Sequence, residues 1–435
     1  MKRSNRELEL PRNGDTSSGF GDSTLNRELL PRPISYWKMK PLQSFRVLDL
    51  TNVLAGPFCC HQLAHLGAEV IKIEVPGRGD LARQLGADPE LNEKGMGVSF
   101  LAQNAGKRSL TLNLKHPEGR EVFFRLVSKA DVVVENFRPG VMERLGLGFE
   151  KLKEVNPSLV YCAISGFGQN GPLKDSPAYD QIIQGLSGVM SVTGNDESGP
   201  LRVGFPMADT IGGITAALGI TASLSKPERE AVFIDVSMLE STMASMGWVI
   251  SNFLTAGVDP MRMGNENFTS APSGTFQTGE GLLNIAANKQ EQFEILCGLL
   301  KREDLIHHPH FKTRELRKAN RELLKSKLES ELKHHDAGYW SGLLNKAGVP
   351  AGEVLKVPEA LSLEQVQQRE FLETFSDVPG VGRSVQVVKT GMQLNGKTLT
   401  VDRPPPRLGE DTVAILKECG YGEETIEKLQ AEKVI

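Results

Sequence analysis

Three glycines in the stretch S-G-F-G-Q-N-G-P (165–172) have the spacing G-x-G-x-x-G. This spacing is typical of a loop that binds the pyrophosphate of NAD or FAD, where a strand leads into the loop and a helix begins within it. The apolar run 159–165 fits the strand, but Pro172 and Pro177 flank a polar segment where that helix would have to begin. We therefore interpret the stretch as a strand-to-loop turn and expect no nicotinamide or flavin site.

A second candidate for chemistry is Asp209, which lies immediately before the Gly- and Ala-rich run 210–223. We predict that run to be a buried helix. An aspartate in this place is ordinarily an N-cap, because its carboxylate accepts hydrogen bonds from the first free amides. A carboxylate among small residues that let a ligand approach is also suited to covalent nucleophilic catalysis. From the residues alone both interpretations stay open.

Basic residues near predicted strand ends are candidates for binding phosphate, since guanidinium groups pair bidentately with such anions and lysine supplies a point charge. They are Lys107, Lys115, Arg138 and Arg144. A solvated surface is the alternative for these four. The stretch E-N-F-R-P-G (135–140) favours an adenine nucleotide, because an aromatic ring, a cation and an amide stand together at a strand exit.

Other chemistry has weaker support in the sequence. The stretch H-H-P-H (307–310) is interrupted by Pro309 and has no Cys or paired carboxylate at ligand spacing, so we predict a surface turn and no metal site. Neither a G-x-S-x-G elbow nor a phosphate-binding P-loop occurs. Serine hydrolase and P-loop functions therefore lose their main support.

The elements that must position these residues alternate between strands and helices from residue 45 onward. Strands are predicted at 46–50, 69–74, 108–114, 131–135 and 159–165. Such alternation is typical of an α/β fold with a parallel sheet covered on both faces. A sheet of this kind binds ligands beyond the carboxyl ends of its strands. Farther along, a strand at 232–236 precedes a predicted long apolar helix at 237–254.

The composition of the chain limits the classes of partner and the cellular compartment that we expect. The net charge of −4 argues against a dedicated nucleic-acid binder, because no excess positive field exists. No uninterrupted apolar run approaches the length of a membrane span, so we expect no membrane partner. The five cysteines are odd in number and lack C-x-x-C spacing, which is typical of free thiols in a reducing cytoplasm. We expect a cytoplasmic protein, with a polar leader (1–38) that is disordered and dispensable.

From Met39 to the C-terminus the sequence resembles the class III CoA-transferase family (CaiB/BaiF type), which includes formyl-CoA transferase and succinyl-CoA:dicarboxylate CoA-transferases. The resemblance is carried by the stretches 47–57, 66–74, 104–115, 130–146, 165–172, Y-D (179–180) and M-A-D (207–209). It implies a large Rossmann-like domain with a parallel sheet, split in sequence, a smaller α+β domain and an interlocked homodimer. The domains then correspond to 39–230 (CoA-binding, first part), 231–264 (linker helix region), 265–363 (small domain) and 364–435 (return to the large domain).

The resemblance also implies a site. Asp209 matches the catalytic aspartate, which forms an acyl-aspartyl anhydride and then an aspartyl-CoA thioester. The family's CoA-binding positions fall on Leu54, Ala55, Val75, Leu112, Lys115, Asn136, Phe137, Arg138, Arg144 and Tyr179. Some relatives carry glutamine in place of Leu54 and arginine in place of Val75. CoA and its thioesters are then substrates, and no permanently bound cofactor is expected.

The alternative with the same fold is a 2-methylacyl-CoA racemase, which needs a base on each side of Cα. Tyr179 stands where that enzyme has histidine, and an unperturbed tyrosine titrates near pH ~10, so it is a poor base at neutrality. We therefore predict a CoA-transferase.

Similarity favours succinyl-CoA as donor and a small dicarboxylate as acceptor, whose distal carboxylate would pair with Arg202, Arg262 or Lys289. The sequence leaves open which acids react, whether the leader is functional, whether Tyr179 and Asp180 act directly in catalysis, and which loop shields the intermediate.

Overall fold

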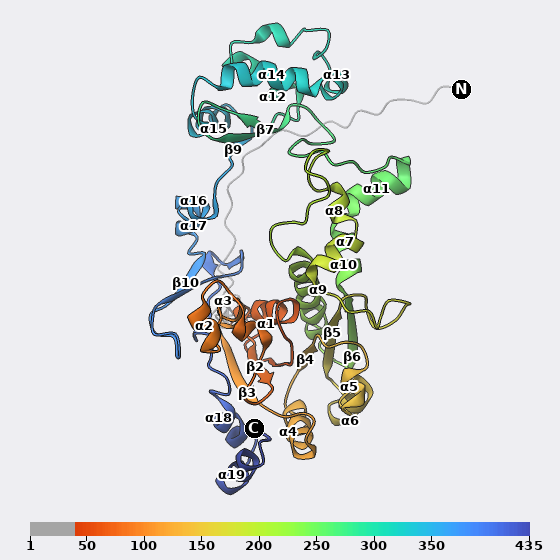
Figure 1. The fold of residues 1–435 in the computed structure, drawn as a ribbon, viewed down its shortest axis with the longest axis vertical. Coiled ribbons are helices and arrows are strands. Elements are labelled where there is room, and N and C mark those ends of the chain that lie inside the picture. Colours follow the sequence, from red (N-terminus) through yellow and green to blue (C-terminus); the bar gives the residue numbers. More distant parts are fainter. Residues whose placement is uncertain (1–39) are drawn as a thin grey trace, which may run out of the picture. The chain divides into compact units, whose positions relative to one another are not determined.

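A computed structural model describes residues 40–435 of the chain, and the predicted leader lies outside the described residues. Its centre is a six-stranded parallel sheet with strand order β3-β2-β1-β4-β5-β6 (Figure 1). The strands are β1 (Arg46–Asp49), β2 (Glu69–Glu74), β3 (Lys107–Thr111), β4 (Val132–Glu135), β5 (Val160–Ser165) and β6 (Val232–Ser237). This is the order of a Rossmann fold, in which the direction of winding reverses between β1 and β4. The predicted α/β class with a parallel sheet is confirmed.

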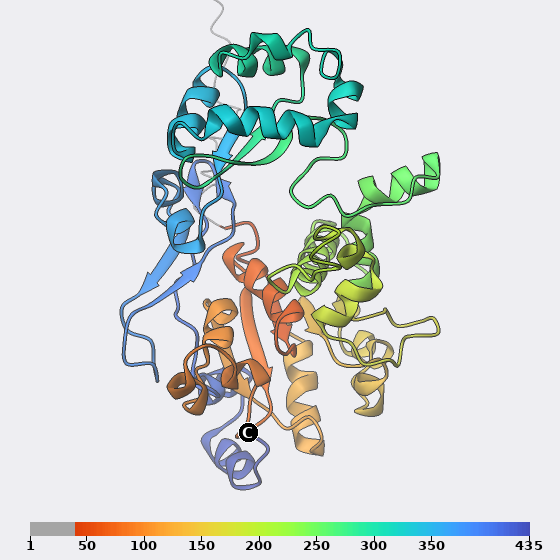
Figure 2. The ribbon, with the colours of Figure 1, turned by 45° about the horizontal axis from the view of Figure 1, so that its top comes forward.

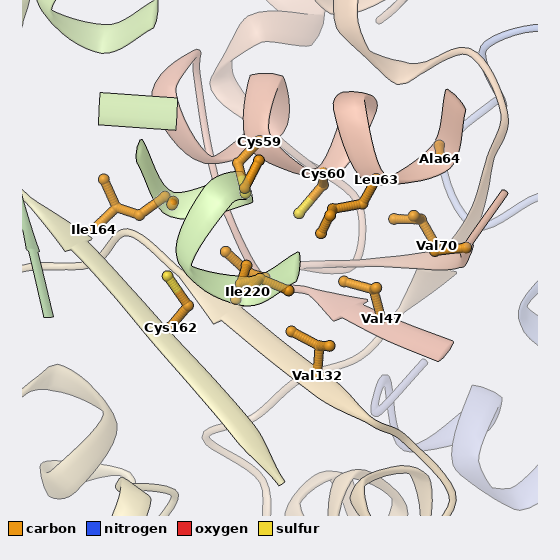
Figure 3. Packing of buried hydrophobic residues seen from close by; sticks show 14 of the residues in the cluster. Val47, Cys59, Cys60, Leu63, Ala64, Val70, Val132, Cys162, Ile164 and Ile220 are labelled. Atoms are coloured by element: carbon orange, nitrogen blue, oxygen red, sulfur yellow. The ribbon is translucent and has the colours of Figure 1, made fainter. Parts of the chain in front are cut away.

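Both faces of the sheet are covered, which explains why its strands read as continuous apolar runs. Successive side chains of a strand point to opposite faces, so Val47 and Leu48 belong to different cores. On one face, the core packs beneath α1 (Ala55–His65) and α9 (Met207–Leu224), as Figure 3 shows for Cys59, Cys60 and Ile220. On the other face it packs beneath α4 (Pro117–Val127), α18 (Thr412–Glu418) and α19 (Glu423–Ala431).

A smaller antiparallel sheet has the order β7-β8-β9, with strands β7 (Ser273–Gln277), β8 (Leu282–Ala286) and β9 (Ala351–Glu353). Its helices, drawn in green-blue shades in Figure 2, include α12 (Gln290–Leu299), α14 (Arg321–Leu332) and α15 (Ala337–Lys346). These elements share a core of their own, which contains Leu283, Phe293, Leu328 and Trp340. The chain therefore has a smaller antiparallel domain, while the predicted boundaries at 230, 264 and 363 stay predictions.

The remaining elements are short. In the first half of the chain they are η1 (Leu81–Gln84), α2 (Pro89–Glu93), α3 (Val98–Asn104), α5 (Val141–Arg144), α6 (Phe149–Val155), α7 (Asp180–Leu186) and α8 (Val189–Val192). In the second half they are α10 (Met238–Ser245), α11 (Gly247–Ala256), η2 (Glu303–Leu305), α13 (Arg314–Ala319), α16 (Val357–Leu361), α17 (Glu364–Gln368), β10 (Leu372–Phe375), β11 (Val385–Val388), β12 (Gln393–Leu394) and β13 (Lys397–Thr398).

The last residues of the chain contact the parallel sheet. The Arg108 guanidinium on β3 donates to both carboxylate oxygens of Glu418, at 2.9 and 2.7 Å, and to Glu69 on β2 at 2.7 Å. Asp411 accepts a hydrogen bond from the backbone N–H of Ser109 at 3.0 Å. These contacts join the C-terminal helices to the edge strand β3.

Two predicted helices differ from the structure. The predicted helix 210–223 begins earlier, at Met207, so Asp209 lies inside it. The predicted long helix 237–254 is two helices, α10 and α11, separated at Met246. Helix α9 also has the length and composition of a membrane-crossing helix. In the fold, however, Ala208, Ala216 and Ile220 of α9 are buried in the core beneath α1, so one side of this helix packs against the sheet.

Candidate functional site

A pocket of about 240 Å³ lies at the carboxyl ends of β1, β4 and β5, next to the point where the strand order reverses. It brings together seven of the predicted site residues: Leu54, Ala55, Asn136, Phe137, Arg138, Tyr179 and Asp209. Asn52, Lys174 and Met238 are among the other residues that line it. A doubly wound sheet binds its ligands at this location, because loops diverge on either side of the switch point.

The two loops that meet at the switch point are tied together by one amide side chain. Asn136, directly after β4, accepts a hydrogen bond at Oδ1 from the backbone N–H of Asn52 at 2.8 Å. Its Nδ2 donates to the backbone carbonyl of Asn52, also at 2.8 Å. The Asn136 amide therefore holds the floor of the pocket in shape, with both of these bonds made to the loop after β1.

A buried ion pair supports the loop after β1 from below. Lys107 Nζ lies 2.8 Å from Asp49 Oδ2, both side chains are fully buried, and the ammonium also donates to the carbonyl of Pro57 at 3.0 Å. Lys107 was a phosphate-binding candidate in the sequence, and this expectation is wrong. The ammonium is used inside the protein, and burial of charge is tolerated here because the pair is complete.

A second buried pair fixes the same loop. Lys72 Nζ lies 2.9 Å from Asp80 Oδ2 and donates to the carbonyl of Thr51 at 2.8 Å. Asp80 Oδ1 accepts from the backbone N–H of Val53 at 2.9 Å. Val53 has φ +68°, which is rare for a β-branched residue, so this hydrogen bond helps to hold a strained backbone beside Leu54.

Asp209 enters the pocket from the first turn of α9. The N-cap residue of this helix is Pro206, so Asp209 is not the N-cap and that interpretation is wrong. The capping carboxylate comes from Asp180, whose Oδ1 accepts from the backbone N–H of Ala208 at 2.8 Å. Asp209 is thus left with its side chain unused by the helix that carries it.

The surroundings of Asp209 disfavour its charged form. Burial raises the pKa of the Asp209 carboxyl to about 7, and the negative charge of Asp180 contributes to the same rise. Among residues 40–435, no lysine or arginine forms an ion pair with Asp209 within 4.0 Å. A carboxylate with a pKa near neutrality is a stronger nucleophile than an ordinary one and is still largely ionised in mildly basic solution.

A close helix–helix contact brings Asp209 to the loop after β1. A Cβ built on Gly213 would lie 2.5 Å from the carbonyl oxygen of Ala55 and 3.1 Å from Phe58 Cδ1. Only glycine lets α9 approach the start of α1 this closely. One turn along the helix from Gly213, Asp209 consequently faces the loop that contains Leu54.

The glycine stretch after β5 is a turn, as predicted. The first helix after β5 is α7, which begins at Asp180, so no helix terminus lies within the G-x-G-x-x-G spacing. A Cβ on Gly166 would lie 2.4 Å from the Ala178 side chain, which shows how closely the loop folds back. Tyr179 follows and lines the pocket with 69% of its surface exposed.

Four predicted CoA-binding residues lie outside the pocket. Val75 is 52% exposed after β2, and Lys115 and Arg144 are exposed on the surface. Leu112 is buried in the core beneath α4, so its side chain is not available to a ligand. These residues stay predictions for a ligand longer than the pocket, with Leu112 restricted to backbone contacts.

Sequence reasoning named Asp180 but missed Gln184, which holds it beside the nucleophile candidate. Gln184 is fully buried, donates to Asp180 Oδ2 at 2.7 Å and accepts from the backbone N–H of Val203 at 2.8 Å. Asp180 and Gln184 are four residues apart on α7, which is the spacing of one helix face. That spacing was a visible signal, whereas the contact with residue 203 depends on the tertiary fold.

Comparison with known proteins identifies the family of the chain. The sequence model described as CoA-transferase family III matches residues 42–412. The chain belongs to CoA-transferase family III. This family III chain is 39% identical to the acetyl-CoA:oxalate CoA-transferase of Acetobacter aceti over 382 residues, which cover 87% of this chain and 95% of that one. It is 36% identical to the succinyl-CoA:glutarate CoA-transferase of Mus musculus over 400 residues, with 91% of each chain covered.

Solved structures resemble this family III fold as well. The structure of a CAIB/BAIF family protein from Brucella suis superposes with a TM-score of 0.76 at 33% sequence identity. The superposition covers 88% of this chain and all of that one. The predicted family and the predicted enzyme class, a CoA-transferase, are confirmed.

Proposed function

We propose that this CoA-transferase moves CoA from succinyl-CoA to a small dicarboxylate through a covalent intermediate on Asp209. The observation that carries the proposal is the position of the Asp209 carboxylate, which opens into the switch-point pocket without an ion-pair partner among the described residues. The names of related enzymes support the substrates, since they include succinyl-CoA:glutarate and succinyl-CoA:mesaconate CoA-transferases.

The proposed chemistry begins with the donor thioester. The Asp209 carboxylate attacks the thioester carbonyl carbon, the C–S bond breaks, and CoA leaves as a thiolate, so that a mixed anhydride of Asp209 and the donor acid remains. The thiolate then attacks the Asp209 carbonyl carbon, which releases the donor acid as its carboxylate and leaves an aspartyl-CoA thioester. The acceptor carboxylate repeats both steps in reverse order. No oxidant, reductant or net proton is needed, and one exchange is divided into steps of similar free energy.

The pocket residues would hold CoA while these bonds change. Asn136 and the loop after β1 define the floor, and Arg138 and Lys174 supply cations for the phosphates. The thiolate need not leave the protein between the first and the last step. We propose that CoA acts only as a substrate in this cycle.

Trapping tests the covalent step directly. Enzyme incubated with succinyl-CoA is treated with hydroxylamine or borohydride and digested, and we expect mass spectrometry to find the label on the peptide that contains Asp209. The matched control is Asp209→Asn, which keeps the side-chain size and removes the nucleophile, and we expect at least a 10³-fold lower kcat. Full CoA exchange between acids in wild-type enzyme without a label on that peptide would contradict the mechanism.

The proposed assembly is an interlocked homodimer. The supporting observation is α11, on which no residue is buried and Trp248 and Leu254 are 72% and 74% exposed. Ile214 and Leu218 of α9 are also exposed, at 52% and 69%. Apolar surface of this extent on a globular protein is typically covered by a partner, and a second copy is the commonest partner.

We also propose a reducing compartment, the cytoplasm, for this enzyme. The five cysteines are free, and each is buried. Buried free thiols are typical of proteins that fold where disulfides do not form. Fractionation of the source cells followed by detection of the chain tests this placement.

A further inference from the structure

The segment that leads into α9 carries an arginine close to the proposed nucleophile. Arg202 Nη2 lies 3.7 Å from Asp180 Oδ2, and 45% of the arginine side chain is exposed. Asp180 Oδ1 accepts from the backbone N–H of Ala208 at 2.8 Å and lies 3.5 Å from that of Asp209. One carboxylate group therefore separates the Arg202 guanidinium from the first turn of the helix that carries Asp209.

The backbone next to Arg202 is held in place, while its guanidinium makes few bonds of its own. Gln184 accepts from the backbone N–H of Val203 at 2.8 Å and donates to the carbonyl of Phe205 at 3.3 Å, so the segment is fixed on both sides. Within residues 40–435, the contact with Asp180 is the one interaction of the Arg202 guanidinium, and its length exceeds a direct hydrogen bond. Most of its five N–H donors are thus available.

Asp180 does not neutralise this arginine fully, because its oxygens serve other donors. Oδ2 accepts from Gln184 Nε2 at 2.7 Å, and Oδ1 accepts from the N-terminus of α9. A planar guanidinium with free donors is the side chain best suited to binding a carboxylate bidentately. Arg202 also lies outside the pocket that contains Asn136 and Tyr179, so it is not placed for the CoA that this pocket would hold.

We infer that Arg202 binds the distal carboxylate of the acid whose proximal carboxylate reacts at Asp209, and so selects dicarboxylates over monocarboxylates. This inference rests on the proposed function. A dicarboxylate joined to Asp209 through one end has its second carboxylate a few bonds away, and Asp180 links the Arg202 guanidinium to the backbone of the helix turn that carries Asp209. A monocarboxylate of equal length presents a methyl group there and leaves the guanidinium without a partner.

Two other cations are candidates from the sequence for binding the distal carboxylate, and the structure favours Arg202. Arg262 Nε donates to the carbonyl of Asn195 at 3.3 Å and Nη2 lies 3.6 Å from Asp196. Lys289 precedes α12 beside the small sheet. Neither has a contact with Asp180 or Asp209.

The test compares acceptors of equal chain length. With succinyl-CoA as donor, kcat/KM is measured for glutarate and for valerate in wild type, Arg202→Ala and Arg202→Lys. In a ping-pong reaction the acceptor's kcat/KM depends on the aspartyl-CoA enzyme and the acceptor, so the donor does not distort the comparison. We expect Arg202→Ala to lower the glutarate-to-valerate ratio by roughly 10- to 100-fold, mostly through KM for glutarate. Arg202→Lys should retain part of the ratio.

Arg262→Ala is the matched control, for which we expect an unchanged ratio. Equal losses for both acids in Arg202→Ala would show a merely structural role and overturn the inference, as would an unchanged ratio or a ratio that depends on Arg262. Failure of the proposed function is a separate result, because wild-type enzyme would then transfer CoA to neither acid or to valerate alone. Thermal unfolding of each variant checks that the fold is kept.

Discussion

At the scale of single residues, the site depends on two carboxylates that have different tasks. Asp180 is saturated with hydrogen bonds from Ala208 and Gln184, whereas Asp209 has a pKa raised to about 7 by burial and by the charge of Asp180. As the proposed nucleophile, Asp209 must be ionised to attack a thioester. The rising limb of the pH profile of kcat/KM, which reports the free enzyme, is therefore expected near pH 7.

Removing the negative charge of Asp180 should shift the rising limb of the pH profile of kcat/KM. Asp180→Asn keeps an oxygen that can accept from Ala208 and removes the negative charge that raises the pKa of Asp209. A lower pKa ionises the nucleophile at lower pH, so we expect the limb to shift down by about one pH unit or less. Burial still acts on Asp209, so the midpoint should stay well above the ordinary range of aspartate. An unchanged midpoint in a folded variant would show that Asp180 does not tune Asp209.

The buried pair of Lys107 and Asp49 leads to a prediction about stability. Lys107→Met leaves Asp49 charged and unpaired in the core, which should lower the free energy of unfolding by about 3–5 kcal/mol. The control is Lys151→Met, which removes a lysine whose pair with Glu154 is exposed and should change stability little. Urea unfolding of both variants measures the difference. Similar small losses in both would contradict the importance of the buried pair.

The resemblance to the family predicted the residues of this pocket better than it predicted their supports. Asp209, Asn136 and Tyr179 were predicted as site residues through it, and the pocket contains all three. Lys107 was predicted as a candidate for binding phosphate because a lysine near a strand end is a typical ligand for anions. Only the folded structure shows that Asp49 lies beside it. The N-cap interpretation of Asp209 failed because the true capping oxygen comes from Asp180, far away in sequence.

At the scale of elements, the approach of α1 and α9 positions Asp209, the proposed nucleophile. The contact depends on Gly213, where a Cβ would meet Ala55 O at 2.5 Å, and on the small residues around it. Glycines on one side of a helix allow such an approach but lower its intrinsic helicity.

Two substitutions in the same helix separate these effects. Gly213→Ala should lower the free energy of unfolding by about 1–3 kcal/mol and reduce kcat, because α9 must shift away from the loop that contains Leu54. Gly219→Ala should be neutral or stabilising by up to ~1 kcal/mol, since its Cβ would lie 3.4 Å from Ile234 Cγ2, an ordinary contact. Thermal unfolding and initial rates of both variants check this. Equal effects of the two would contradict the close-contact argument.

The strands were predictable and some helix limits were not. Runs such as 131–135 are apolar on both sides because both sheet faces are covered, and this signal needs no tertiary knowledge. The break between α10 and α11 at Met246 has no Pro or charge in the sequence to announce it. The start of α9 was placed three residues late because Asp209 was interpreted as a possible N-cap, whereas the N-cap residue is Pro206 and Asp180 accepts from the N–H of Ala208.

At the scale of the whole molecule, the exposed side chains of α11 bear on assembly. Trp248→Glu should weaken the proposed homodimer, because it places a charge in the centre of an apolar surface that a second copy would cover. The control is Val357→Glu on α16, which is 74% exposed and outside that surface. Sedimentation velocity over a range of concentrations should show a monomer for the first variant at concentrations where wild type and control are dimers. A monomeric wild type would rule out the homodimer.

Because buried cysteines lie in separate cores of the enzyme, the reactivity of their thiols can measure local unfolding in each core. Cys59, Cys60 and Cys162 lie in the core between the parallel sheet and the helices α1 and α9 (Figure 3), whereas Cys297 lies in the core of the antiparallel domain. A thiol reagent can reach these sulfurs only in molecules that have opened at that place, so labelling rates measure local stability. The enzyme would be exposed briefly to a thiol reagent in low denaturant, and the label on each cysteine peptide would be quantified. The comparison would tell whether the antiparallel domain unfolds locally before the parallel sheet.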